Sequence, residues 1–172
     1  MYRQEKKQYR VLTAVISACV GIFLGFILCR IILVPFVVPN DSMAPTLREG
    51  ETIIILKHAA LNRGDIVLVE SPVEPGRYLL KRVAAVEGST VEVRDRTFFV
   101  NNERFAFPWQ TASSDNRIFP MAFTERDTMP PVRIGRNRYF LLSDNLDRGF
   151  DSRTFGPVSG DRVVGKMIFR IQ

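Results

Sequence analysis

A serine lies in a short loop between two prolines, in the stretch VPNDSMAPTL (38–47). Pro39 precedes Ser42 by three residues and Pro45 follows it by three, and because proline fixes the backbone angle φ, the loop is stiffened. A hydroxyl held in one place is suited to nucleophilic attack, but at neutral pH it needs a base. Taken alone, Ser42 has a simpler interpretation as an ordinary turn or capping residue.

The residue that fits the role of base is Lys81. His58 is the single histidine of the chain, and its setting is that of a surface loop. Lys81 lies in YLLKRVAAV (78–86), where its neighbours on one face of a predicted strand are apolar. An unperturbed lysine of pKa ~10.4 is neutral in about one molecule in 2,500 at pH 7, but burial lowers a lysine pKa by ~3–5 units. A solvated strand lysine is the alternative interpretation.

The elements that must position these residues are short strands. Runs of apolar and β-branched residues between turn signals predict strands at 52–56, 65–70, 78–86, 91–94, 97–100, 139–142 and 163–171. This spacing favours an all-β fold, mostly antiparallel, with a barrel-like core. Residues 101–138 are expected to form a variable, irregular insertion. Its FAFPW stretch (105–109) either reaches lipid headgroups or covers the insertion's own core.

An apolar segment precedes this body. No charge occurs from Val11 to Cys29, a length of roughly 28 Å as a helix, enough to cross the hydrocarbon core. Bases in the first ten residues predict a cytoplasmic N-terminus. We therefore expect a cytoplasmic tail (1–10), one transmembrane helix (11–34) in the inner or cytoplasmic membrane, and a domain on the periplasmic or extracellular side (35–172). A cleaved signal, or a lipoprotein box at ISAC (16–19), is the alternative, but the apolar run continues beyond both.

Charge and composition exclude other classes. The formal net charge is +6, of which residues 1–30 carry +4 (five bases, one acid), so the remaining chain carries only +2 and no nucleic acid is expected as a partner. The two cysteines, Cys19 and Cys29, both lie in the apolar run. With one histidine and no other thiol, neither a metal site nor a disulfide framework is expected, and no cofactor is implied.

Four separated blocks resemble the bacterial type I signal peptidases: PNDSMAPTLREGE (39–51), RGDIVLVE (63–70), YLLKRVAAVEG (78–88) and SDNLDRGFDSRTFGPVSGDRVVGKM (143–167). The resemblance implies a membrane-bound serine endopeptidase that removes signal peptides from exported preproteins after small residues, usually Ala-x-Ala. Ser42 matches the nucleophile and Lys81 the general base of its Ser/Lys dyad. The partners implied are preprotein signal peptides and membrane lipid, and a monomer is expected.

The last block departs from the family at two positions. By resemblance it supplies a charged cluster that supports the site: Asp144, Asp151 and Arg153. The family commonly has glycine where this chain has Ser143. Many members also have a serine, thought to hydrogen-bond the lysine ammonium, where this chain has Gly149. Ser152 is the nearest remaining hydroxyl of the block, and the sequence leaves open whether it substitutes.

Residues beside Ser42 are candidates for binding the substrate. The backbone N–H of Ser42 is the obvious donor to an oxyanion, and the side-chain amide of Asn40 is a hypothetical second donor. Apolar residues near the serine are predicted to line shallow pockets for an extended peptide: Phe36, Val38 and Met43.

Three other functions remain open on the sequence. A self-cleaving regulator of the LexA-like kind uses the same Ser/Lys chemistry, but an anchor and the lack of a DNA-binding domain argue against it. A peptidase dedicated to a few substrates, such as pilus or secretion-system subunits, is compatible with the departure at Gly149 and with Asn40, at whose position the family often has serine or glycine. A catalytically inactive scaffold is disfavoured because Ser42 and Lys81 are both present in their full motifs.

Overall fold

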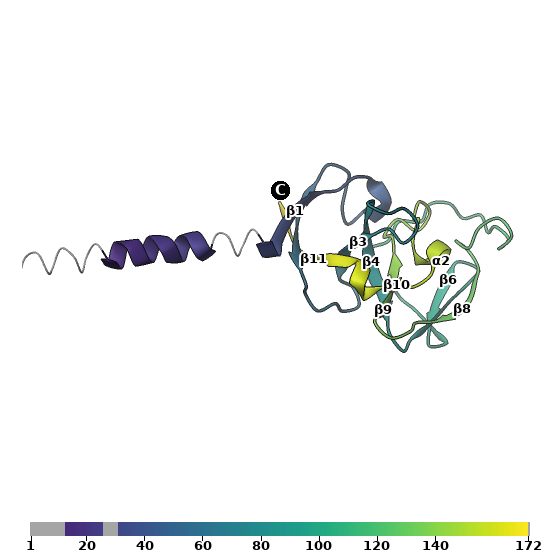
Figure 1. Cartoon of the computed structure of the whole chain (residues 1–172). Coiled ribbons are helices and arrows are strands. Elements are labelled where there is room, and N and C mark those ends of the chain that lie inside the picture. Colours follow the sequence, from purple (N-terminus) through teal and green to yellow (C-terminus); the bar gives the residue numbers. More distant parts are fainter. Residues whose placement is uncertain (1–12, 26–30, 172) are drawn as a thin grey trace, which may run out of the picture. The chain divides into compact units, whose positions relative to one another are not determined.

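The computed structural model describes residues 13–25 and 31–171 (Figure 1). The chain divides into two compact units, Met1–Val34 and Pro35–Gln172. Residues 13–25 of the first unit are helical. Within the described ranges, no helix combines the length and the apolar character needed to cross a membrane. The predicted tail (1–10) and parts of the predicted anchor (11–12 and 26–30) lie outside the described residues.

The described chain from Leu33 onward forms two sheets. The larger sheet has the order β1-β2-β11-β3-β4-β9-β10. Its strands are β1 (Leu33–Val37), β2 (Thr52–Lys57), β11 (Val163–Ile171), β3 (Ile66–Glu70), β4 (Tyr78–Val86), β9 (Arg138–Leu142) and β10 (Val158–Ser159). The smaller sheet has the order β7-β6-β5-β8, with β7 (Glu103–Arg104), β6 (Thr97–Val100), β5 (Thr90–Arg94) and β8 (Met129–Arg133). Neighbouring strands from β2 to β10, and all pairs of the smaller sheet, are antiparallel, which confirms the mostly antiparallel β prediction.

Each strand expected from the sequence is present, with bounds that differ by at most one residue. The unexpected strands are those with weak signals. β7 and β10 have two residues each, and β8 (MPPVR) contains two prolines, which remove ladder donors. β1 begins within the range expected for the anchor, at Leu33. β8 pairs with β5, so part of the 101–138 segment joins the smaller sheet.

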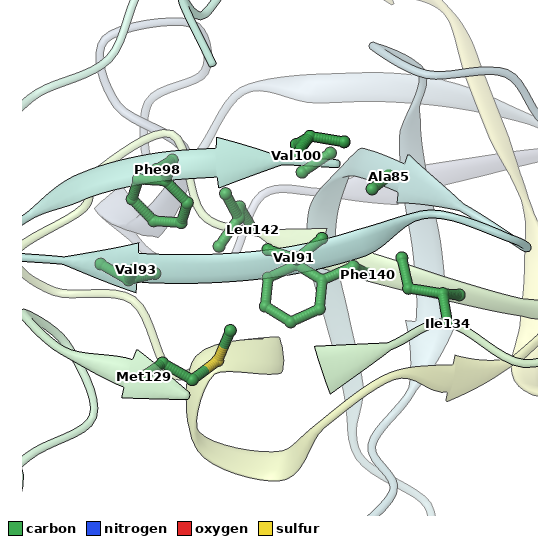
Figure 2. Close-up of a cluster of buried hydrophobic side chains, with 10 residues drawn as sticks. Ala85, Val91, Val93, Phe98, Val100, Met129, Ile134, Phe140 and Leu142 are labelled. Carbon is green, nitrogen blue, oxygen red and sulfur yellow. The ribbon is translucent and has the colours of Figure 1, made fainter. Parts of the chain in front are cut away.

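A hydrophobic core joins the two sheets (Figure 2). It contains Ala84, Ala85, Phe140 and Leu142 from the larger sheet, and Val91, Val93, Phe98, Val100 and Met129 from the smaller one, together with Ile134. Phe105 and Phe107 pack against this core, and the Phe107 ring contacts Phe98 edge-on with the centroids 5.1 Å apart. Trp109 lies beside Phe107 with centroids 5.5 Å apart and ring planes tilted by 57°. These contacts favour the interpretation that the 105–109 stretch covers a core.

The strand that matters for the site is β4. It lies inside the larger sheet, between β3 and β9, and its residues from Leu79 to Ala85 are all buried. Lys81 is paired with Val67 of β3, and Arg82 with Leu142 of β9. Because successive side chains leave opposite faces of a strand, Lys81 and Arg82 project to opposite sides of the sheet.

Candidate active site

Ser42 lies in a single turn of 3-10 helix, η1 (Asp41–Met43). Asn40 caps this turn, because its Oδ1 accepts a hydrogen bond from the Ser42 backbone N–H at 3.0 Å. The Met43 side chain is fully buried and fixes the turn to the core. On the other side, the Asn145 N–H donates to the Ser42 carbonyl oxygen at 2.9 Å. The serine is therefore held on both sides, by the core and by the loop that follows β9.

Lys81 brings its amine to this serine from β4. Its side chain is 3% exposed. The Nζ atom donates to the Leu80 carbonyl oxygen at 3.0 Å and to Ser42 Oγ at 3.4 Å. The second contact joins residues 39 positions apart in the sequence, and it links the strand to the proline-bracketed loop.

Burial changes the electrostatics of this amine. Desolvation disfavours the charged form and lowers the pKa of Lys81 from 10.5 to about 8, with smaller contributions from Arg153 and Arg77 in the same direction. Asp151 and Asp144 oppose this effect and raise the pKa. With a pKa of about 8, roughly one molecule in ten carries a neutral amine at pH 7. The proton acceptor that Ser42 needs is therefore available near neutral pH.

A cleft of about 330 Å³ opens at these two side chains. Its lining comes from the η1 loop, from β4 and from the loop after β9. The residues are Asn40, Asp41, Ser42, Glu49, Arg77, Leu79, Lys81, Arg148 and Phe150. A peptide bound in this cleft would contact the Ser42 hydroxyl and the Lys81 amine. Among the described residues, no group of three His, Cys, Asp or Glu side chains is placed to hold a metal ion.

Two buried ion pairs contribute charges that act on Lys81. Arg82 binds Asp144, with Nε 2.7 Å from Oδ1. Arg153 binds Asp151 through two contacts, of 2.9 and 2.8 Å. The Asp151 carboxylate also caps the short helix α2 (Ser152–Phe155) by accepting the Arg153 N–H. Each of these four buried charges therefore has a partner of opposite sign, as burial requires.

A fixed hydroxyl beside a largely desolvated lysine can carry out nucleophilic acyl transfer. Comparison with known protein families matches residues 9–172 to the family described as "Signal peptidase, peptidase S26". The chain belongs to this family. It is therefore a hydrolase, a serine endopeptidase of the signal peptidase I kind.

Individual relatives cover most of the chain. Signal peptidase I T of Bacillus subtilis (strain 168) is 28% identical over 155 aligned residues, and the match covers 87% of this chain and 79% of the relative. Signal peptidase IB of Staphylococcus aureus (strain COL) is 28% identical over 176 residues, covering 93% of this chain and 88% of the relative. A crystal structure of a signal peptidase I from Enterococcus faecalis V583 is 27% identical, covers 64% of this chain and 98% of that chain, and has a TM-score of 0.47.

The residues predicted to support the site of this peptidase lie in two groups. Asp144, Asp151 and Arg153 are at most 4% exposed and lie around Lys81 as members of the two ion pairs. Asn40 lies at the cleft, and its Oδ1 accepts the Ser42 N–H, so one of the two expected oxyanion donors, the Ser42 N–H, is occupied.

The structure places the three residues of the predicted substrate pocket away from the cleft wall. Val38 and Met43 are 1% and 0% exposed, because their side chains point into the core beneath the loop. Phe36 is half-buried on β1 and is not part of the cleft wall. The apolar side chains that do line the cleft are Leu79 and Phe150. Proximity to Ser42 in sequence was the wrong guide, because the path of the chain through η1 sets the direction of each side chain.

Sequence reasoning also missed Arg82. A charged residue next to Lys81 within an apolar strand implies a buried partner, and this signal could have identified it. Ser152, considered as a replacement for the hydroxyl absent at Gly149, has another role. Its Oγ accepts the Leu141 N–H at 2.9 Å, so it fixes α2 to β9.

Proposed function

We propose that this peptidase removes signal peptides from exported preproteins at a membrane surface, with Ser42 as nucleophile and Lys81 as general base. The observation that carries the proposal is the 3.4 Å separation between Lys81 Nζ and Ser42 Oγ, made by an amine that is buried in a strand. The names of the relatives supply the substrate class, since each is called a signal peptidase I.

The acylation step starts from neutral Lys81. The Ser42 O–H proton passes to the Nζ lone pair while Oγ bonds to the scissile carbonyl carbon. The tetrahedral intermediate then collapses, the carbon–nitrogen bond breaks, and the Lys81 ammonium returns the proton to the leaving amine. The signal peptide stays bound to Ser42 as an ester. In the second half, Lys81 deprotonates a water molecule that hydrolyses this ester and regenerates both residues.

The oxyanion of the intermediate needs donors that are in place before it forms. The Ser42 N–H is directed at Asn40 Oδ1, 3.0 Å away, which therefore occupies the position of an incoming oxygen. We assign Asn40 two states. In the free enzyme its carbonyl oxygen caps η1, and with substrate bound its side chain rotates so that Nδ2 donates to the oxyanion beside the Ser42 N–H.

The preferred substrate is an extended peptide with small residues at −3 and −1 of the cut, Ala-x-Ala. Leu79 is 7% exposed and lies two positions before Lys81 on β4, so it presents a shallow apolar surface beside the base. Phe150 is 40% exposed and supplies a second apolar wall. A cleft with such shallow walls next to the nucleophile accepts a methyl side chain and excludes a large one.

The membrane part of the proposal rests on the N-terminal sequence. The uncharged run and its basic flank support an arrangement in which 1–10 is cytoplasmic, 11–34 spans the membrane and 35–172 lies outside. Residues 101–138 are then the variable insertion of the external domain. This arrangement would present the cleft to preproteins as they leave the membrane.

The test is cleavage of a preprotein with an Ala-x-Ala site by the full chain in detergent micelles, with the product identified by mass spectrometry. Wild type should cut after the second alanine, and Ser42→Ala and Lys81→Ala should be inactive. Replacement of the −1 alanine by leucine should abolish cleavage. An inert wild type would contradict a general signal peptidase, and an active Lys81→Ala would contradict the dyad.

A further inference from the structure

Ser143 carries a hydroxyl that the structure leaves unexplained. The residue is 1% exposed, and its Oγ has no hydrogen-bond partner among the residues that the structure describes. A buried polar group without a partner costs about 1–3 kcal/mol, so such groups are uncommon and each needs an explanation. Its backbone N–H is used, since it donates to Asp151 Oδ2 at 3.1 Å. Only the side chain is free.

Strand register places this hydroxyl beside Lys81. In the antiparallel pair of β4 and β9, Val83 is opposite Leu141 and Arg82 is opposite Leu142. The last printed pair of this register is Arg82 and Leu142, at the end of β9, and extending the register by one residue sets Lys81 opposite Ser143. Directly opposite residues project from the same face, with Cβ atoms about 4.5–5.5 Å apart. The unpartnered hydroxyl and the amine therefore share one face of the sheet.

Gly149 supplies the space that this serine occupies. A Cβ added at Gly149 would lie 2.7 Å from both Cβ and Oγ of Ser143, and it would also collide with Asp151 Oδ2. The Gly149 backbone has no positive φ, so the constraint on this position is space rather than conformation. A side chain at 149 and a hydroxyl at 143 are mutually exclusive in this packing.

We propose that Ser143 is a positioning residue: its hydroxyl, unpartnered among the described residues of this structure, accepts a hydrogen bond from the Lys81 amine during catalysis and directs the amine lone pair at Ser42. This rests on the proposed function of the dyad. A neutral amine has two N–H groups and one lone pair. One N–H is satisfied by the Leu80 carbonyl oxygen, 3.0 Å from Nζ. If Ser143 Oγ accepts the other, the lone pair is left for the Ser42 proton.

The hydroxyl also affects the charge state of Lys81. An ammonium makes stronger hydrogen bonds than an amine, so an acceptor at Ser143 stabilises the charged form more than the neutral form. The other charged groups that act on Lys81 are Asp151, Asp144, Arg153 and Arg77. All four remain when Ser143 is changed, so the effect of the hydroxyl can be measured separately from theirs.

The experiment compares full-length wild type, Ser143→Ala and the control Ser89→Ala, which removes another buried hydroxyl, at the turn between β4 and β5. Two quantities are measured in detergent micelles: the pH profile of kcat/KM on a preprotein, and the titration of Lys81 by carbon-13 NMR at Cε, assigned with Lys81→Met. In Ser143→Ala we expect kcat/KM to fall by roughly 100-fold at its plateau. The midpoints of both titrations should move to lower pH, and Ser89→Ala should leave both quantities unchanged.

A double variant distinguishes loss of the hydroxyl from misfolding of the variant protein. Gly149→Ser alone should be poorly active because of its collision with Ser143. Ser143→Gly combined with Gly149→Ser removes the collision with Ser143, and rotation of the Asp151 carboxylate removes the remaining one. The hydroxyl of the new serine then occupies the same space. Activity should therefore be at least tenfold higher than that of Gly149→Ser alone.

The proposal is overturned if Ser143→Ala keeps the wild-type kcat/KM and the wild-type Lys81 titration, or if the double variant is no better than Gly149→Ser. Failure of the dyad itself would look different, because wild type would then be inert or Lys81→Met would be active. In that event the Lys81 titration still decides the role of Ser143, since an unmoved midpoint in Ser143→Ala contradicts it.

Discussion

Arg82 and Asp144 form a bidentate ion pair on the face of β4 opposite to Lys81, with Nε 2.7 Å from Oδ1 and Nη2 2.5 Å from Oδ2. The Arg82 side chain is 9% exposed and the Asp144 side chain is fully buried. Arg82 also donates to the Gly64 carbonyl oxygen at 2.8 Å and to Thr46 Oγ1 at 3.2 Å. This one guanidinium therefore ties β4 to the loop before β3, to the segment after η1 and to the loop after β9.

Breaking this pair should be costly, because it leaves a buried guanidinium without its counter-charge. Asp144→Ala should lower the free energy of unfolding by about 3–5 kcal/mol, measured by urea denaturation of the full chain in micelles. Glu74→Ala is the matched control, since it removes a pair with Arg77 in which both side chains are about half exposed. The control should change stability by no more than about 1 kcal/mol, and equal losses in both variants would contradict the account.

The buried amine should make stability depend on pH. The pKa of Lys81 is about 8 in the folded state, against 10.5 for a lysine in the unfolded chain. Between these two pH values the unfolded chain therefore binds a proton that the folded chain does not. Stability therefore rises with pH across this window, by about 3 kcal/mol in total. Lys81→Met, which keeps the length of the side chain, should be more stable than wild type at pH 7 and should lack this rise. A wild type whose unfolding free energy is constant from pH 8 to 10.5 would exclude a desolvated Lys81.

Variants of Asn40 separate its two proposed states. Asn40→Asp keeps an acceptor for the Ser42 N–H but removes the donor, so kcat should fall by roughly 100- to 1,000-fold. Asn40→Ser keeps a capping oxygen and a donating hydroxyl and should retain most of the activity. Turnover is measured at saturating preprotein. Full activity of Asn40→Asp would show that the side chain only caps η1.

The sequence was a good guide where local pattern decides structure. The strand from Tyr78 to Val86 was predicted with its observed bounds, because most of its residues are apolar or aromatic and a turn signal precedes it. The pairing of Ser42 with Lys81 came from the family resemblance, since nothing local connects two positions so far apart. Val38 and Met43 were assigned to the wrong surface because their direction depends on the path of the η1 loop.

Ser143 could not have been interpreted from the sequence. Its position opposite Lys81 follows from the register of β4 and β9, and the need for Gly149 follows from the space beside it. The buried partner of Arg82 lies 62 residues later in the chain. The apolar pattern of the strand indicates that the charge of Arg82 needs a buried partner, but only the fold identifies this partner as Asp144.

The most direct test of the central claim, that a neutral Lys81 is the base for Ser42, is the pH dependence of kcat/KM on an Ala-x-Ala preprotein from pH 6 to 10. The account predicts that kcat/KM rises with unit slope and levels off with a midpoint near 8, the pKa given to Lys81 by its burial. Lys81→Met should be inactive throughout, and His58→Gln should reproduce the wild-type profile. A profile that is flat from pH 6 to 10, or one that His58→Gln abolishes, would contradict the role of Lys81.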